Sequence, residues 1–267
     1  MMISHNELRE AFEAKAAAWD AYTATPAGRL REELNWRYLV RHLPPASQVP
    51  RVLDAGGGTG GLAVRLAQRG YRVHLLDIAD EMLRLALEKA RAAGVEDRVR
   101  IRHARVENLA QHFGPETFDA VVCHTLLEYV PAPQSVVSDL AEVLQSGGIF
   151  SLVFVNRYAD AMRLALAKRD LIAAREALTA TSSPADLFGV PRRTFDADMI
   201  REMLVTAGVE TTAQYGVRIF ADYLTNSTWQ DDPAAFDALL ALETAAAHRF
   251  PYRLIGRYGQ TIGRRVG

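Results

Sequence analysis

The stretch VLDAGGGTG at residues 52–60 constrains the fold of this chain more than any other part of the sequence. Its apolar run carries Asp54 near the end. The glycines that follow satisfy the pattern G-x-G-x-x-G, at Gly56, Gly58 and Gly61. This pattern is typical of a buried strand that turns tightly into a helix and holds a nucleotide-like ligand, although such turns also occur without one. Since such a strand needs helices on its faces, the sequence predicts a layered α/β domain.

Strand-like and helix-like segments alternate through most of the chain, which implies a parallel sheet with right-handed crossover connections. Strands are expected at 51–55, 71–77, 98–104, the first part of 118–130, 149–155, 209–220 and 252–262. Helices are expected through Leu62, Leu66 and Ala67, over 80–93, through Val136, Leu140 and Leu144, and near 158–178, 196–207 and 233–248. The stretch 179–193 is polar and rich in chain breakers, so it is predicted to be a loop.

Two further helices are expected before the first strand. The capping-box pattern S-x-x-E at 4–7 opens one, and Thr25-Pro26 opens the other. The expected organisation is a helical cap over 1–48 and an α/β domain over 49–267, with insertions near 157–195 and 222–250. Ligands of such folds bind beyond the carboxyl ends of the strands, so the cap and the insertions are expected to cover a binding site.

Composition excludes several classes of protein. The net charge of −1 gives no global indication of nucleic-acid binding, although a local basic patch could still provide it. The single cysteine, Cys123, excludes a disulfide within the chain and favours the cytoplasm. No run of about 20 apolar residues could span a membrane, and the N-terminus lacks an apolar signal core. The histidines are scattered without metal-ligand spacing, so we expect no metal.

Two acids near the glycine turn discriminate between nucleotide-like ligands. Asp77 ends the second strand about twenty residues past the turn, where an acid can hold the ribose hydroxyls of NAD or of S-adenosylmethionine. Asp54 would repel the pyrophosphate of a dinucleotide, whereas it would attract the ammonium and sulfonium of S-adenosylmethionine. The charge of Asp54 therefore favours S-adenosylmethionine as the cofactor.

The cofactor half carries a set of motifs. They are D-x-G-x-G after a strand, an acid ending the second strand, FDAVVCHTLLEYV at 118–130 and LQSGG before the fifth strand. Together they resemble the class I S-adenosylmethionine-dependent methyltransferases over roughly residues 50–155. The resemblance implies a Rossmann-like fold, with a seven-stranded, mostly parallel sheet and helices on both faces. The N-terminal helices and the helical insertions would be additions to that fold.

Further segments lie outside that half: GRLREELNW at 28–36, GVRIFADYL at 216–224 and PYRLIGRYGQ at 251–260. With HTLLEYV at 124–130, they are similar to the tRNA 5-carboxymethoxyuridine methyltransferase family. Members of that family methylate the side-chain carboxylate of a modified wobble uridine in tRNA. The stretch 157–195 departs from the family pattern and keeps only PRRTF at its end.

The cofactor contacts that the resemblance implies are Arg31, Gly56, Gly57, Asp77, Val106, Glu107 and His124, to which the ligand argument adds Asp54 and Gly58. Arg31 could pair bidentately with the carboxylate of the cofactor, although its helix alone indicates a surface arginine. Val106 and Glu107 follow the third strand, where adenine commonly lies in this fold. His124 ends the fourth strand, beside the expected position of the methyl group, and a merely packed side chain is the alternative.

A carboxylate acceptor needs no general base, because it is already ionised at neutral pH. Catalysis then depends on positioning and desolvation, with cations and hydrogen-bond donors that hold the carboxylate. The candidates for positioning the acceptor are Arg218, Tyr223, Arg257, Tyr258 and His124. A phenol, amine or thiol acceptor would need a base, for which His124 and Glu128 are the nearby candidates.

The C-terminal region indicates how tRNA could bind. A phosphate-facing patch could form from Arg192, Arg193, Arg249, Arg253, Arg257, Arg264 and Arg265. Phe250, Tyr252 and Tyr258 could stack an extruded base, while a charged outer strand is the alternative interpretation. The rival enzyme is a small-molecule O- or carboxyl-methyltransferase with the same cofactor site. The rival outside enzymes is a cofactor-binding module without turnover, and the oligomeric state stays open.

Overall fold

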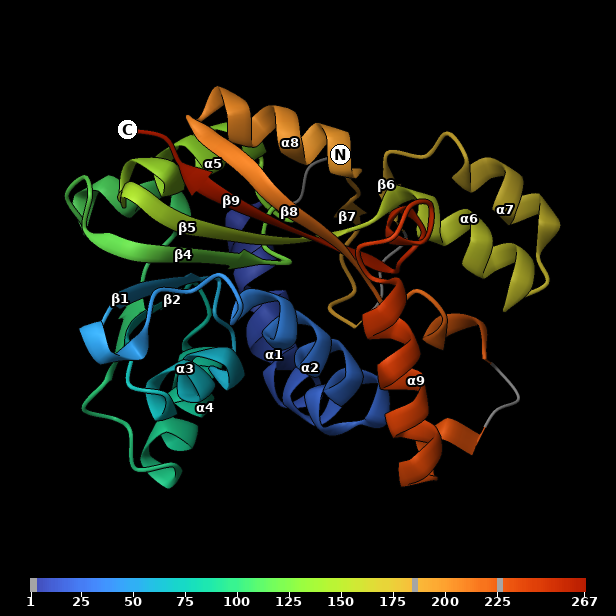
Figure 1. Ribbon diagram of the computed structural model, residues 1–267, viewed down its shortest axis with the longest axis horizontal. Coiled ribbons are helices and arrows are strands. Elements are labelled where there is room, and N and C mark those ends of the chain that lie inside the picture. Colours follow the sequence, from blue (N-terminus) through green and yellow to red (C-terminus); the bar gives the residue numbers. More distant parts are fainter. Residues whose placement is uncertain (1–3, 184–186, 225–227) are drawn as a thin grey trace.

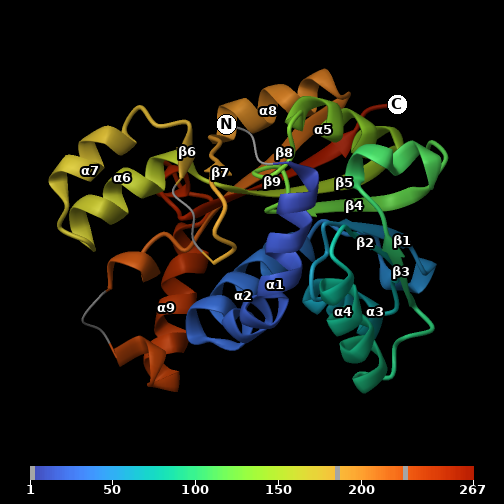
Figure 2. The ribbon, with the colours of Figure 1, turned by 180° about the vertical axis from the view of Figure 1, so that it is seen from behind.

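A computed structural model describes residues 4–183, 187–224 and 228–267, and it contains the predicted seven-stranded sheet. The strands lie in the order β3-β2-β1-β4-β5-β9-β8 (Figures 1 and 2). Their bounds are Arg51–Ala55 for β1, Arg72–Asp77 for β2, Val99–His103 for β3, Phe118–His124 for β4, Leu144–Val155 for β5, Val209–Val217 for β8 and Tyr258–Arg265 for β9. Strand β9 runs antiparallel to both of its neighbours, β5 and β8, and the other six strands run parallel to one another. The order reverses between β1 and β4, which is where such folds open a ligand crevice.

Helices cover both faces of the sheet, as the sequence predicts (Figure 1). One face carries α3 and α4, and the other carries α5 and α8. The bounds of these helices are Gly61–Gln68, Asp80–Ala92, Pro133–Glu142 and Ala197–Thr206. Alternate residues of the central strands enter opposite cores: Leu53 packs on the α5 side, and Val52 packs on the α3 side. Burial on both faces explains why the strands are continuous apolar runs in the sequence.

The two N-terminal helices form where their caps predict. Helix α1 spans His5–Ala24 with its capping box formed, and α2 spans Pro26–Leu39 with Thr25 as its N-cap. Ala16 of α1 packs with Ala79 and Met82 near the start of α4. Figure 2 shows α1 crossing beside the carboxyl edge of the parallel strands.

Some predicted boundaries were wrong. The helix predicted over 158–178 is two helices, α6 (Arg157–Leu166) and α7 (Leu171–Ala177), separated by Arg169 with a left-handed φ of 57°. The helix predicted to include Leu144 ends at Glu142, because Leu144 already pairs with Phe118 in the sheet. The strand predicted over 252–262 begins only at Tyr258, because a 3₁₀ turn, η5 (Tyr252–Leu254), precedes it.

The stretch 179–193, which was predicted to be a loop, contains a two-stranded ribbon that pairs β6 (Ser182–Ser183) with β7 (Arg192–Arg193). The helix predicted over 233–248 is confirmed as α9, which spans Pro233–Ala246. The other 3₁₀ turns are η1 (Ala46–Gln48), η2 (Val106–Gln111), η3 (Ala221–Tyr223) and η4 (Thr228–Gln230). Parts of both insertions, at 184–186 and 225–227, lie outside the described residues. Within the described ranges no helix has the length and apolar character needed to cross a membrane.

Candidate active site

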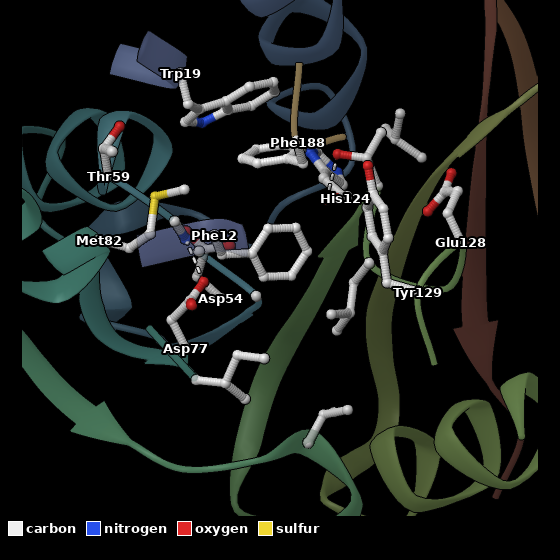
Figure 3. A pocket seen from close by; sticks show the side chains of 18 of the residues that line it. Phe12, Trp19, Asp54, Thr59, Asp77, Met82, His124, Glu128, Tyr129 and Phe188 are labelled. Carbon is white, nitrogen blue, oxygen red and sulfur yellow. Dashed lines mark hydrogen bonds between the residues drawn. The ribbon is translucent and has the colours of Figure 1, made fainter. Parts of the chain in front are cut away.

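A cavity with a volume of about 1040 Å³ opens at the carboxyl edge of the central strands. Asp54 of β1, Asp77 of β2 and His124 of β4 line it (Figure 3). Helix α1 covers it with Phe12, whose ring lies 4.7 Å from the ring of Phe188. The cavity therefore lies where the topology predicts a ligand site, beneath the N-terminal helices.

The glycine turn is held by hydrogen bonds to Asp77 and by tight packing at Gly57. The N–H of Gly58 donates to Oδ2 of Asp77 at 2.9 Å, and Gly58 has a φ of 54°, which favours glycine. A Cβ at Gly57 would lie 2.6 Å from the side chain of Leu75, so a larger residue does not fit. Asp77 also accepts from the N–H of Ala79 at 3.0 Å. The turn and its acid are thus fixed before any ligand arrives.

Asp54 is a buried carboxyl with an unsatisfied oxygen. It is 3% exposed, and its Oδ2 makes no hydrogen bond among the described residues. Burial, together with the negative charges of Glu32 and Asp77, raises the pKa of Asp54 to about 7. A ligand that brings positive charge to this carboxyl would stabilise its ionised form.

Arg31 lies inside the protein rather than on the surface of its helix. It is 6% exposed, and its Nη2 donates to Oε1 of Glu32 at 2.7 Å. Its guanidinium lies 4.6 Å from the ring of Trp19 and 5.5 Å from the ring of Tyr258. The surface interpretation of Arg31 is therefore wrong, because α1 folds over it and places its charge in the cavity wall.

The remaining predicted cofactor residues also line the cavity. Gly56 belongs to the turn, while Val106 and Glu107 begin η2 after β3. Nε2 of His124 lies 2.9 Å from Oγ of Ser151. Burial, with a smaller effect from the charge of Arg31, lowers the pKa of His124 to about 3. His124 is therefore an uncharged part of the wall at neutral pH.

Two arginines, Arg218 and Arg257, line one part of the cavity, which we call its far end. The N–H of Arg257 donates to the carbonyl of Arg218 at 3.0 Å. Arg218 pairs with Asp222 and donates to the hydroxyl of Tyr22 at 2.8 Å. Arg257 pairs with Asp160 at 2.8 Å. Each guanidinium is thus held by its own carboxylate while it lines the cavity.

A buried glutamate that the sequence analysis did not select holds the segment around Arg218. Glu243 of α9 accepts from the N–H groups of Ile219, Phe220 and Ala221 at 2.6, 2.8 and 3.0 Å. These bonds fix a turn in which Arg218 has a φ of 57°. The indication of Glu243 in the sequence was an acid within the mostly apolar run ALLALETAA of α9.

The two tyrosines predicted to position the acceptor, Tyr258 and Tyr223, differ in placement. Tyr258 lines the cavity and is 6% exposed. Burial would raise the pKa of Tyr258, but the charges of Arg31, Arg218 and Arg257 outweigh burial and lower it. Tyr223 is absent from the described residues that line the cavity.

The single basic patch predicted from the C-terminal sequence was wrong. Arg264 donates to the carbonyl of Gly147, near the start of β5. Because β9 runs antiparallel to β5, this position lies at the opposite edge of the sheet from Arg257. Arg265 binds backbone carbonyls at the same distant edge. Arg192 is buried in the cavity wall instead of facing outward. The surface group near the N-terminal end of β9 comprises Arg249, Phe250, Tyr252 and Arg253.

The sequence of the chain is similar to known methyltransferases. Residues 52–148 match the family described as the methyltransferase domain. The tRNA 5-carboxymethoxyuridine methyltransferase of Escherichia coli K12 is 34% identical over 248 residues, which cover 90% of each chain. The ubiquinone biosynthesis O-methyltransferase of Paracidovorax citrulli is 40% identical over 43% of this chain and 48% of that protein. The first similarity therefore spans nearly the whole molecule, whereas the second is limited to less than half.

Solved structures share the fold. A methyltransferase of Thermotoga maritima aligns with a TM-score of 0.65 at 15% identity, over 96% of this chain and 99% of that chain. The 1,6-didemethyltoxoflavin N1-methyltransferase of Burkholderia thailandensis, with bound S-adenosylhomocysteine, aligns with a TM-score of 0.58 at 16% identity, over 100% and 92%.

Proposed function

This chain belongs to the class I S-adenosylmethionine-dependent methyltransferases, and we propose that it methylates the carboxylate of 5-carboxymethoxyuridine at the wobble position of tRNA. The relative with that named activity covers 90% of this chain, including the segments on both sides of the methyltransferase domain. A tRNA acceptor would also place the protein in the cytoplasm.

The observation that carries the proposal is the pair of guanidiniums at the far end of the cavity. Arg218 and Arg257 have side chains that are only 12% exposed, and their backbones are hydrogen-bonded to each other. Planar guanidiniums bind carboxylates through paired hydrogen bonds. Such an arrangement suits an anionic acceptor much better than a neutral phenol or amine.

The residues at the other end fit the cofactor of this family. The free oxygen of Asp54 suits the ammonium and sulfonium, and the two oxygens of Asp77 lie beside the glycine turn where ribose hydroxyls bind. Arg31 supplies a fixed positive charge for the carboxylate of the cofactor. In this assignment Gly57 lets the turn pack tightly against Leu75 and Asp54 at the cofactor site, and Val106 and Glu107 hold the adenine.

The mechanism needs orientation rather than proton transfer. S-adenosylmethionine, when bound, would supply an electrophilic methyl group on a sulfonium, and an acceptor carboxylate would need no general base because it is already ionised at neutral pH. Arg218 and Arg257 orient the carboxylate, and their partners Asp222 and Asp160 limit how much charge they withdraw from it. The neutral His124 does not repel the sulfonium, as a charged imidazolium would. Phe12 and the rings around it exclude water, which would otherwise solvate the nucleophile.

A small-molecule carboxylate is the second candidate acceptor. It is favoured by the aromatic cover, in which the ring of Phe12 lies 5.0 Å from the ring of Tyr129 and narrows the entrance. A nucleotide in an RNA loop would have to be extruded from its stack to pass this cover.

The test is transfer of labelled methyl groups from S-adenosylmethionine to tRNA that carries 5-carboxymethoxyuridine, followed by nucleoside analysis. We expect the label in a base-labile ester of that nucleoside. The matched control is the same tRNA with 5-methoxyuridine, which lacks the carboxylate and should receive no label. No label in either tRNA, with cofactor binding intact, would reject the tRNA acceptor and favour the small-molecule candidate.

A further inference from the structure

Glu128 is a buried acid that the transfer described above does not use. It follows β4, is 4% exposed and lines the cavity. Its Oε1 accepts from the N–H of Val155 at 2.6 Å, whereas its Oε2 makes no hydrogen bond with any described residue. Figure 3 shows Glu128 beside Tyr129, on the opposite side of the cavity from Asp54 and Asp77. Glu128 therefore presents a free oxygen to the cavity, on the side away from Asp54 and Asp77.

An unpaired buried carboxylate oxygen is costly, so a ligand that satisfies it gains both affinity and specificity. Burial raises the pKa of Glu128 to about 7, against the backbone hydrogen bonds that it accepts and the positive charges of Arg192 and Arg31. Because two arginines already bring positive charge near Glu128, we expect the partner of Oε2 to be a neutral N–H donor rather than another cation.

We infer that Oε2 of Glu128 accepts a hydrogen bond from the ring N3–H of the acceptor base, so that Glu128 selects uracil over cytosine. This inference rests on the proposed function. The acceptor then has two recognised ends: a carboxylate held by Arg218 and Arg257, and a ring N–H held by Glu128. The arrangement excludes simple aliphatic and aromatic carboxylates, which leave the oxygen of Glu128 unsatisfied.

The variant Glu128→Gln gives a directional test. An amide oxygen can keep the hydrogen bond from the N–H of Val155, which places an NH₂ group where Oε2 was. That NH₂ group opposes the N3–H of uracil but donates well to the unprotonated N3 of cytosine. The variant should therefore exchange its preference between the two bases instead of losing activity generally.

The experiment measures kcat/KM for methyl transfer to synthetic anticodon stem-loops that carry 5-carboxymethoxyuridine or 5-carboxymethoxycytidine. We expect Glu128→Gln to lower transfer to the uridine substrate about 10- to 100-fold and to raise the cytidine-to-uridine ratio at least as much. The matched control is Glu116→Gln, an exposed glutamate outside the cavity, which should leave both values unchanged. An equal loss on both substrates, or no loss on either, would overturn the inference.

A substrate change in the unaltered enzyme tests the same contact without relying on the fold of a variant. The N3-methyl derivative of 5-carboxymethoxyuridine replaces N3–H by N–CH₃ and so cannot donate a hydrogen bond from N3. We expect the wild-type protein to use it about 10- to 100-fold less well than the uridine substrate. Equal use of both would overturn the role of Glu128 alone, whereas no transfer to the uridine substrate itself would reject the proposed function.

Discussion

Two sets of buried charged groups in the cavity differ in whether they already have partners. At the cofactor end, Asp54 is buried with a free oxygen and without a cationic partner among the described residues. At the acceptor end, Arg218 and Arg257 are each already paired with a carboxylate. The difference indicates that a bound cation would give Asp54 its missing partner. A bound anion would instead share Arg218 and Arg257 with the carboxylates that already pair with them. Cofactor binding should then be linked to protons, and acceptor binding should depend on geometry.

The largest effect should follow from breaking the acceptor end. Arg218→Ala removes one guanidinium and leaves Asp222 unpaired, so the carboxylate is neither neutralised nor oriented. We expect a loss of about 10³-fold in kcat/KM for transfer to tRNA, with the dissociation constant for S-adenosylmethionine changed less than about threefold. Transfer kinetics and calorimetric titration measure the two quantities.

The control for this change is Arg264→Ala, which removes an arginine at the other end of β9. It should leave both quantities unchanged. If Arg218→Ala instead abolished cofactor binding, the division of the cavity into two ends would be incorrect.

The cofactor end should respond to pH through Asp54. In the ligand-free protein this carboxyl keeps its proton up to about pH 7, whereas in the unfolded chain it loses the proton near its ordinary pKa. Its ionisation thus destabilises the folded protein as the pH rises through that window, and a bound cation offsets the cost. Affinity for S-adenosylmethionine should therefore rise by about tenfold from pH 5.5 to 7.5 and then level off.

Asp54→Asn should remove this pH dependence and weaken binding at pH 7.5, because an amide cannot pair with a cation. Calorimetry in buffers of different ionisation enthalpy would also detect proton release near pH 6 for the wild-type protein and none for the variant. A wild-type affinity that falls as the pH rises would contradict the role given to Asp54.

The cofactor end could be predicted from the sequence because chain connectivity alone creates it. Asp54 and the glycines are neighbours in the sequence, and Asp77 enters the same turn through the pairing of β1 with β2. Every strand of the seven-stranded sheet was predicted as well, and the central strands were the easiest because they are buried apolar runs. The boundaries failed where tertiary pairing overrides local pattern, as when Leu144 joins β5 instead of ending a helix.

The acceptor end could be predicted only in part. The positions of Arg218 and Arg257 were expected to be close, but Asp160 lies 97 residues from Arg257 and no local pattern joins them. The burial of Arg31 depends on α1 folding over it. The basic patch failed for a geometric reason: seven residues along an extended strand separate Arg257 from Arg264 by roughly 23 Å.

An intermediate effect should follow from loosening one guanidinium without removing it. Asp160 holds Arg257 at 2.8 Å and also binds Arg163 at 3.3 Å. Asp160→Asn keeps the size of the side chain but removes its charge, so Arg257 should lose its fixed orientation. We expect about a tenfold rise in KM for tRNA with a smaller change in kcat.

The matched control is Asp198→Asn, an exposed aspartate that pairs with Arg201 on the surface of α8. It should change neither constant. A change in cofactor affinity as large as the change in KM would show that Asp160 acts on the whole fold rather than on Arg257.

The smallest effect should come from the surface, where charge acts without fixed geometry. Arg249 is exposed after α9, whereas Arg264 is exposed at the opposite edge of the sheet. If tRNA lies across the surface group of Arg249, Phe250, Tyr252 and Arg253, then Arg249→Ala should weaken tRNA binding about two- to threefold. It should also reduce the slope of log affinity against log salt by about one, because one phosphate contact is lost. Arg264→Ala should leave both affinity and slope unchanged. Equal effects of the two changes would mean that tRNA contacts both edges of the sheet. The arginines at the two edges would then act as one binding surface although they lie far apart.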